Sequence, residues 1–187
     1  RSVIRFLRNN KWIQKPFFFF FGFLRYMFPL EFFILKEGIN SKSYLDLGCG
    51  KHSFTAILPR DTYSVGVDVF TPYIEENKKA QRHTEYIEAD LRKFSIDRKF
   101  DTVFLLDVIE HLDREDGFAL LKNMESWAYK RIMVSTPSGF MPLDIERNNN
   151  KYEVHKSGWR KSDFIDLGYN VTEVNNKLFC IKNMSEL

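Results

Sequence analysis

Cysteine is scarce in this sequence, with only Cys49 and Cys180 among 187 residues. Neither has a spacing typical of a disulfide framework or a zinc site, so we expect no metal. This excludes small disulfide-rich secreted proteins, and a reducing, cytoplasmic compartment is the expectation. The length allows one domain with a sizeable core, and 44% hydrophobic with 28% charged residues is ordinary for a globular protein.

An apolar run long enough to cross a membrane is also missing. The most apolar stretch, residues 16–38, is broken by Arg25, Pro29 and Glu31, whereas a membrane-spanning helix needs about 20 mostly apolar residues. No small-residue cleavage site follows the apolar stretch, as one would in a signal peptide. The sequence therefore predicts neither a span nor a signal peptide in this region.

We expect two parts, a basic and aromatic helical arm over residues 1–38 and one domain over residues 39–187. Five successive phenylalanines, residues 17–21, would point all round a helix, so one face has to meet lipid, a partner or a second layer of protein. Three interpretations stay open: helices packed across the domain, an amphipathic arm on a membrane surface, and a lid or dimerisation element.

The body of the chain lacks an excess of positive charge. The net charge is +3, but residues 1–36 carry seven basic side chains and one acid, which leaves the remainder at about −3. A basic arm on a mildly acidic body does not indicate a groove for nucleic acid. We expect a small-molecule partner and no nucleic acid; the oligomeric state stays open.

From residue 43 onward, strand and helix patterns alternate. Apolar runs and turn residues predict strands over 43–47, 63–69, 84–90, 99–107, 131–137, 170–174 and 177–182. Helices are predicted over 53–58, with Ser53 as the N-cap, and over 72–81, 114–130 and 161–169. This order predicts an α/β, Rossmann-like, doubly wound sheet whose last two strands form a hairpin at Asn175-Asn176. Such sheets bind ligands beyond the carboxyl ends of their strands.

The first predicted strand runs into YLDLGCGKHSF, residues 44–54. Gly48 and Gly50 allow a sharp turn and a close approach to a ligand. A dinucleotide loop would have a third glycine where Ser53 stands. Asp46, two residues before Gly48, is unfavourable beside a pyrophosphate and favourable beside a cation.

Carboxylates follow the next strands as well. Asp68 ends the second strand, where an acid can accept hydrogen bonds from both ribose hydroxyls. Asp90 follows the third and could accept from an exocyclic adenine amine or cap a helix. After the fourth, Asp107, Glu110 and His111 gather three titratable groups; the alternative is turn, cap and packing roles. Together they indicate a ligand with an adenosine end, a cationic amino-acid end and no phosphate, such as S-adenosylmethionine.

Over residues 43–182 the sequence resembles the class I S-adenosylmethionine-dependent methyltransferases. LDLGCG (45–50), VGVDV (65–69), EAD (88–90) and DVIEHL (107–112) are similar to that family's motifs in order and spacing. The resemblance implies a three-layer α/β/α fold with a seven-stranded sheet, mostly parallel, that ends in an antiparallel strand. It departs from many members at His52, where they have a third glycine.

The resemblance also implies site residues. Gly48, Cys49 and Gly50 would pass under the methionine part of the cofactor. Asp46 would help to hold its ammonium group, directly or through water. The other cofactor residues would be Asp68 on the ribose, Val69 on adenine, Asp90 and Leu91 at the adenine amine, and Asp107.

The stretch 136–169 is similar to a segment of small methyltransferases that contains histidine, serine and tryptophan, matched here by His155, Ser157, Gly158 and Trp159. Methyl transfer needs nucleophile and methyl in line, and a base only for a protonated acceptor. His111 or His155 is the predicted base, with a packing or loop role as the alternative. Phe140, Tyr152 and Trp159 would shape the acceptor pocket or simply pack.

The sequence thus predicts a methyltransferase for a small acceptor, and the basic, aromatic arm favours a lipid-linked or amphiphilic one at a membrane surface. The alternatives are a non-catalytic S-adenosylmethionine-binding module and an RNA methyltransferase. His52 favours the non-catalytic alternative. STP (135–137) counts against an RNA methyltransferase, because it lacks the signature of relatives that methylate base amines.

Overall fold

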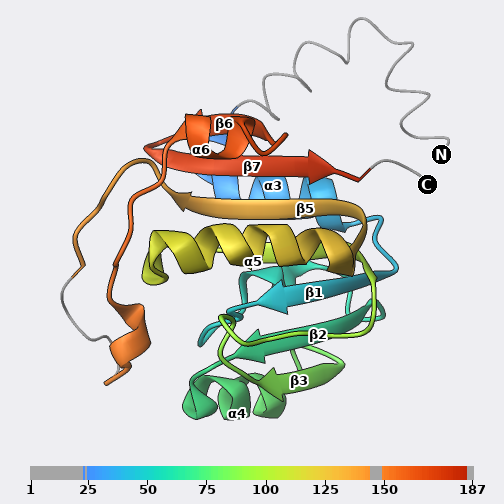
Figure 1. The fold of residues 1–187 in the computed structure, drawn as a ribbon. Helices are drawn as coiled ribbons and strands as arrows, with labels where there is room; N and C mark the ends of the chain where they lie inside the picture. Colours follow the sequence, from blue (N-terminus) through green and yellow to red (C-terminus); the bar gives the residue numbers. More distant parts are fainter. Residues whose placement is uncertain (1–22, 24, 144–148, 185–187) are drawn as a thin grey trace, which may run out of the picture.

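The computed structural model describes residues 23, 25–143 and 149–184, and a seven-stranded sheet lies at its centre (Figure 1). The strand order is β3-β2-β1-β4-β5-β7-β6. The strands are β1 (Ser43–Leu47), β2 (Tyr63–Asp68), β3 (Glu85–Glu88), β4 (Phe100–Leu106), β5 (Ala128–Pro137), β6 (Asn170–Val174) and β7 (Lys177–Asn183).

The pairing of the strands confirms the predicted topology. Strands β1 to β5 pair in parallel, while β7 pairs antiparallel with both β5 and β6. Asn175 and Asn176, with φ of 51° and 59°, make the turn between β6 and β7. Two successive residues at positive φ are typical of the tight turn that matches the twist of a hairpin.

The helical elements are α3 (Pro29–Gly38), η1 (Phe54–Ile57), α4 (Thr71–Lys79), η2 (Ile109–His111), α5 (Arg114–Trp127), η3 (Lys151–Glu153) and α6 (Lys161–Ile165). The predicted helix over 53–58 is wrong, because the chain forms only the short 3₁₀ helix η1 there. Ser53 does not cap it and instead donates its hydroxyl to Asp46. The predicted helix over 161–169 is shorter than expected and is followed by a turn at Gly168, whose φ is 83°.

Helices cover both faces of the sheet, which gives the expected three layers. Helix α5 lies over one face and packs Leu120 and Met124 into the larger core (Figure 1). On the other face, α3 packs Phe33 and Ile34 into a second core, where the ring of Phe33 stacks on Phe179 with centroids 4.5 Å apart. Buried strands in a sheet covered on both sides explain their nearly continuous apolar sequences.

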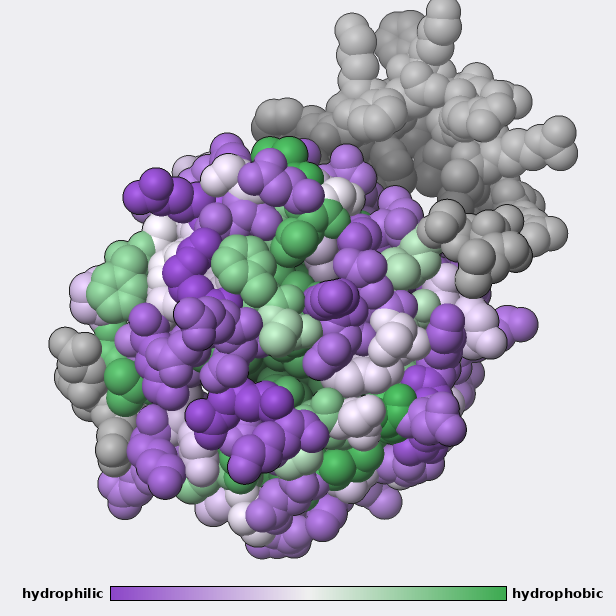
Figure 2. Space-filling model, in the orientation of Figure 1, coloured by the Kyte–Doolittle hydropathy of each residue, from purple (hydrophilic) through white to green (hydrophobic). Residues whose placement is uncertain are grey.

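Helix α3 belongs to the arm predicted over residues 1–38, and it packs on the domain. Residues 17–21 lie outside the described residues. The view in Figure 2 is mostly hydrophilic, with hydrophobic side chains showing between polar ones. Within the described ranges, no helix is long and apolar enough to cross a membrane.

Candidate active site

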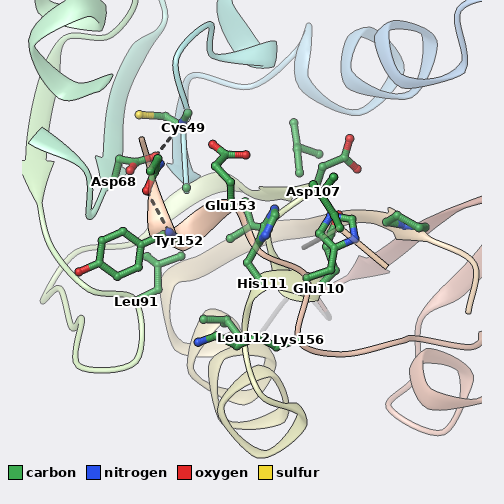
Figure 3. A pocket seen from close by; sticks show the side chains of 18 of the residues that line it. Cys49, Asp68, Leu91, Asp107, Glu110, His111, Leu112, Tyr152, Glu153 and Lys156 are labelled. Carbon is green, nitrogen blue, oxygen red and sulfur yellow. Dashed lines mark hydrogen bonds between the residues drawn. The ribbon is translucent and has the colours of Figure 1, made fainter. Parts of the chain in front are cut away.

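A cavity of about 610 Å³ opens beyond the carboxyl ends of β1, β2 and β4, where the winding of the sheet reverses. Figure 3 shows Cys49 and Asp68 at one end and Asp107 and Glu110 at the other, with Glu153 between them. The predicted site residues that line it are Gly48, Cys49, Gly50, Asp68, Val69, Asp90, Leu91, Asp107, His111 and His155. The topology therefore brings together all but one of them.

The loop after β1 needs its glycines for two different reasons. Gly48 and Gly50 have φ of 69° and 62°, a region that side chains rarely adopt. A Cβ on Gly48 would lie 2.5 Å from Cγ2 of Val108, so close packing also requires glycine there. A Cβ on Gly50 would meet only the carbonyl oxygen of Gly48, at 4.0 Å, so the loop leaves room for a ligand beside Gly50.

Asp68 is held in place by the backbone around it. Its Oδ2 accepts from the N–H of Gly50 at 2.8 Å, and its Oδ1 accepts from the N–H of Phe70 at 2.9 Å. Burial raises the pKa of Asp68, and the two backbone bonds oppose that rise. Each carboxylate oxygen keeps further capacity to accept, so Asp68 can take hydrogen bonds from two neighbouring hydroxyls.

Asp90 and Leu91 line the same side of the cavity. The Nε of Arg92 donates to both carboxylate oxygens of Asp90, at 2.9 and 3.0 Å, and this partner lowers the pKa of Asp90. Leu91 is almost fully buried and belongs to the main core. A charged hydrogen-bond acceptor beside an apolar side chain suits the polar edge of a planar nucleobase.

Asp46 is the exception among the predicted residues, because it does not line the cavity. Its Oδ2 accepts from the hydroxyls of Ser53 at 2.7 Å and Thr55 at 2.8 Å, and lies 3.4 Å from Nε2 of His83. Asp46 is only 2% exposed, so the carboxylate ties the glycine loop to the protein. The structure thus gives it a supporting position and no direct contact with the cavity.

His52, which stands where many relatives have glycine, lines the cavity without filling it. Its side chain is 67% exposed, and its Nδ1 lies 3.8 Å from Glu76. Cys49, in the middle of the same loop, is buried; burial raises the pKa of its thiol, which keeps it neutral. Neither side chain occupies the space that the glycine loop leaves for a ligand.

The other end of the cavity holds two carboxylates. Asp107, with φ of 54°, accepts from the hydroxyl of Ser135 at 2.8 Å and forms an ion pair with Lys177. Glu110 is 3% exposed and accepts from the hydroxyl of Thr136 at 2.9 Å. Burial, followed by the nearby charge of Asp107, raises the pKa of Glu110 to about 8.

His111 and His155, the predicted bases, lie side by side, with ring centroids 4.8 Å apart. Nδ1 of His111 is 3.1 Å from the carbonyl oxygen of Val154, and Nδ1 of His155 is 2.6 Å from that of Met141. Burial lowers the pKa of His111, so its imidazole is mainly neutral at pH 7. A neutral imidazole with a free nitrogen can accept a proton.

The segment with His155 is anchored to the core by Trp159. This side chain is fully buried and donates from Nε1 to the hydroxyl of Ser157 at 2.9 Å. Next to it, a Cβ on Gly158 would lie 2.6 Å from the backbone nitrogen of Phe140, so two chain segments cross there in contact. Trp159 therefore packs and does not line the cavity, nor does the exposed Phe140; Tyr152 does line it.

The sequence placed Glu110 in the cluster with Asp107 and His111 but gave it no role, and it did not indicate Lys177 or Glu153, although all three line the cavity. Glu110 carried a signal, because it lies in the motif that also supplies Asp107 and His111. Lys177 begins the last strand and Glu153 lies in η3, far along the chain from any glycine loop. No local pattern indicates that these two reach the cavity.

Comparison with known proteins agrees with this geometry. Residues 45–127 match the family model described as a methyltransferase domain. The sequence has no significant match among curated proteins.

Solved structures share the fold at low sequence identity. A structure of the DhpI–SAH complex is 16% identical with a TM-score of 0.65, covering 87% of this chain and 86% of that one. The methyltransferase domain of bacterial CtHen1 is 20% identical with a TM-score of 0.62, covering 84% and 97%. Magnesium protoporphyrin IX methyltransferase from Synechocystis PCC 6803, with bound SAM, is 20% identical with a TM-score of 0.59, covering 84% and 76%.

The sheet order, the glycine loop and the strand-end carboxylates agree with the family match. Residues 45–127 are similar to a methyltransferase domain, and the seven-stranded sheet that contains them has the Rossmann-like methyltransferase fold.

Proposed function

We propose that the domain transfers a methyl group from S-adenosylmethionine to a small, partly apolar acceptor bound beside His111 and His155. The observation that supports this is a single cavity that joins a buried, backbone-anchored carboxylate, Asp68, to two adjacent histidines. One end suits the nucleoside of the cofactor, and the other suits a group that must lose a proton as it is methylated.

The residues present fit the cofactor. Asp68 would accept from the two ribose hydroxyls, and Asp90 with Leu91 would meet the adenine edge. The open space beside Gly50 would admit the amino-acid part close to the backbone. S-adenosylmethionine, when bound, supplies an activated methyl group, and the protein contributes by holding the acceptor in line with it.

A base at the acceptor end gives the proton a destination. The carbonyls beside the two imidazoles only accept, so each Nδ1 carries a hydrogen and each Nε2 keeps its lone pair. Either Nε2 can therefore take the proton of an acceptor hydroxyl or amine. Because the rings are in contact, a charge on one disfavours a charge on the other, so a single proton is accepted at a time.

The apolar lining indicates the class of acceptor. Phe54 and Met141 both line the cavity, and each is 49% exposed, next to the apolar Pro142 and Leu143. Large apolar side chains exposed at the rim of a cavity typically mark a ligand-binding surface. An amphiphilic acceptor could lay its apolar part here and present its polar group to the histidines.

The test is turnover of a metabolite and lipid extract with radiolabelled S-adenosylmethionine, followed by separation into organic, aqueous and RNA fractions. We expect label in the organic fraction with the wild-type protein and none with Asp68→Ala. Label in RNA would favour an RNA methyltransferase. Binding of the cofactor without label in any fraction would favour a non-catalytic module and contradict the proposal.

We also propose that residues 1–38 bring the domain to a membrane surface. Phe23, Met27 and Phe28 are each more than half exposed, close in the sequence to Arg25. Exposed aromatic side chains beside basic ones suit an interface with anionic head groups. Flotation with anionic liposomes should recover the full chain but not a Phe23→Ser/Met27→Ser/Phe28→Ser variant; equal recovery of both would exclude this role.

A further inference from the structure

We propose that Glu110, His111 and His155 bind one divalent transition-metal ion at the acceptor end of the cavity. One ligand atom from each of these residues lies within 4.8 Å of the others. Two imidazoles and one carboxylate form a ligand set that suits zinc, cobalt or iron, and three protein ligands leave a position open. All three residues line the cavity, so the open position would face the acceptor.

The two histidines are already in the tautomer that a metal needs. Nδ1 of His111 is bonded to the carbonyl of Val154, and Nδ1 of His155 to the carbonyl of Met141. A carbonyl accepts and never donates, so both Nδ1 atoms carry the hydrogen and both Nε2 atoms offer a lone pair. Metal-binding histidines typically donate their other ring N–H to such a carbonyl, which fixes the ring.

The carboxylate of Glu110 is also oriented by a hydrogen bond. Thr136 donates to Oε2 of Glu110, which orients the carboxylate and leaves Oε1 without a hydrogen-bond donor among the described contacts. The carbonyl of Glu110 accepts from the N–H groups of Lys156 at 2.8 Å and Ser157 at 3.1 Å. These bonds join the segment that carries His155 to the turn that carries the other two residues, so the three side chains are held together without an ion.

The charge of Lys177 does not oppose a cation. Lys177 lies at the same end of the cavity, but its ammonium group is paired with Asp107. Ligands of one tetrahedral zinc ion lie about 3.3 Å apart, so binding draws the three side chains together by about 1–1.5 Å.

A role for the ion rests on the proposed function. With the ion bound, both Nε2 atoms would be ligands and no longer bases; an acceptor hydroxyl at the open position would have a lowered pKa, and its proton would pass to solvent. The oxygen would then form a bond to the methyl carbon as the bond from that carbon to sulfur breaks.

The test is titration of tag-free, chelator-treated full-length protein with Co²⁺, followed by visible absorption. We expect one ion per chain and ligand-field bands that His155→Ala and Glu110→Gln abolish. Changes in outer partners of metal ligands typically weaken affinity 10–100-fold, so Thr136→Val should fall in that range and the loss of a ligand should exceed it. His52→Ala is the matched control, because His52 lines the same cavity with its side chain 67% exposed.

The result that overturns the proposal is Co²⁺ binding that His155→Ala leaves unchanged, binding that His52→Ala removes, or no binding by the wild-type protein. Calorimetry with S-adenosylmethionine on the same variants separates this outcome from failure of the proposed function. Variants that lose cobalt but keep cofactor affinity support a metal site. Loss of both in Glu110→Gln, with normal behaviour of Thr136→Val, would indicate damage to the fold and count against it.

Discussion

Replacing Asp68 by alanine should remove most of the affinity for S-adenosylmethionine. In the proposed pose the carboxylate accepts from two ribose hydroxyls, and a hydrogen bond to a charged group contributes about 1.5–3 kcal/mol. Loss of two such bonds amounts to about 3–6 kcal/mol, which corresponds to an increase in Kd of about two to four orders of magnitude. Isothermal calorimetry measures this change directly.

The same substitution also affects the fold, because Asp68 accepts from the N–H groups of Gly50 and Phe70. An unsatisfied buried donor costs about 1–3 kcal/mol, but Gly50 lines the cavity, where water can reach its N–H, so about 2 kcal/mol in total is expected. Denaturant unfolding without ligand measures this part separately. The variant should therefore remain folded while it loses the cofactor.

Glu88→Ala is the matched control, because Glu88 pairs in register with Asp68 on the neighbouring strand but does not line the cavity. It should bind S-adenosylmethionine as the wild-type protein does. If folded Asp68→Ala binds the cofactor within about threefold of the wild type, the ribose does not lie at Asp68 and the proposed orientation is wrong.

Three further predictions follow from the geometry. Burial raises the pKa of Asp68, and protonation removes the charge that binds the ribose, so affinity for S-adenosylmethionine should begin to fall at a higher pH than it would with an exposed aspartate. Calorimetry across pH should show a flatter profile for Asp68→Asn. Gly48→Ala should lower the free energy of unfolding by about 1–3 kcal/mol more than Gly50→Ala, because only its Cβ meets Val108, and equal denaturant midpoints would contradict this. Trp159→Ala should cost about 3–5 kcal/mol in denaturant unfolding, and a loss below about 1 kcal/mol would show that Trp159 does not anchor its segment.

Local patterns were sufficient for most of the sheet. Strands β6 and β7 and their turn at Asn175-Asn176 follow from alternation and turn residues that lie next to one another in the chain. The helix predicted over 53–58 failed for a tertiary reason. Ser53, a good cap in sequence terms, donates instead to the buried Asp46, and Thr55 does the same.

The sequence by itself determined the fold class and the end of the sheet at which ligands bind. Apolar periodicity is a local property, and parallel strands place the residues that follow them at one edge, so Asp68, Asp90 and Asp107 could be assigned to one cavity before any coordinates. Only the tertiary structure decided that Asp46 turns away from the cavity and that His155 meets Glu110 and His111. Asp46 is held by Ser53, Thr55 and His83, and the position of His155 depends on how the segment around Trp159 packs into the core. Packing between residues far apart in the chain leaves no periodic trace in the sequence.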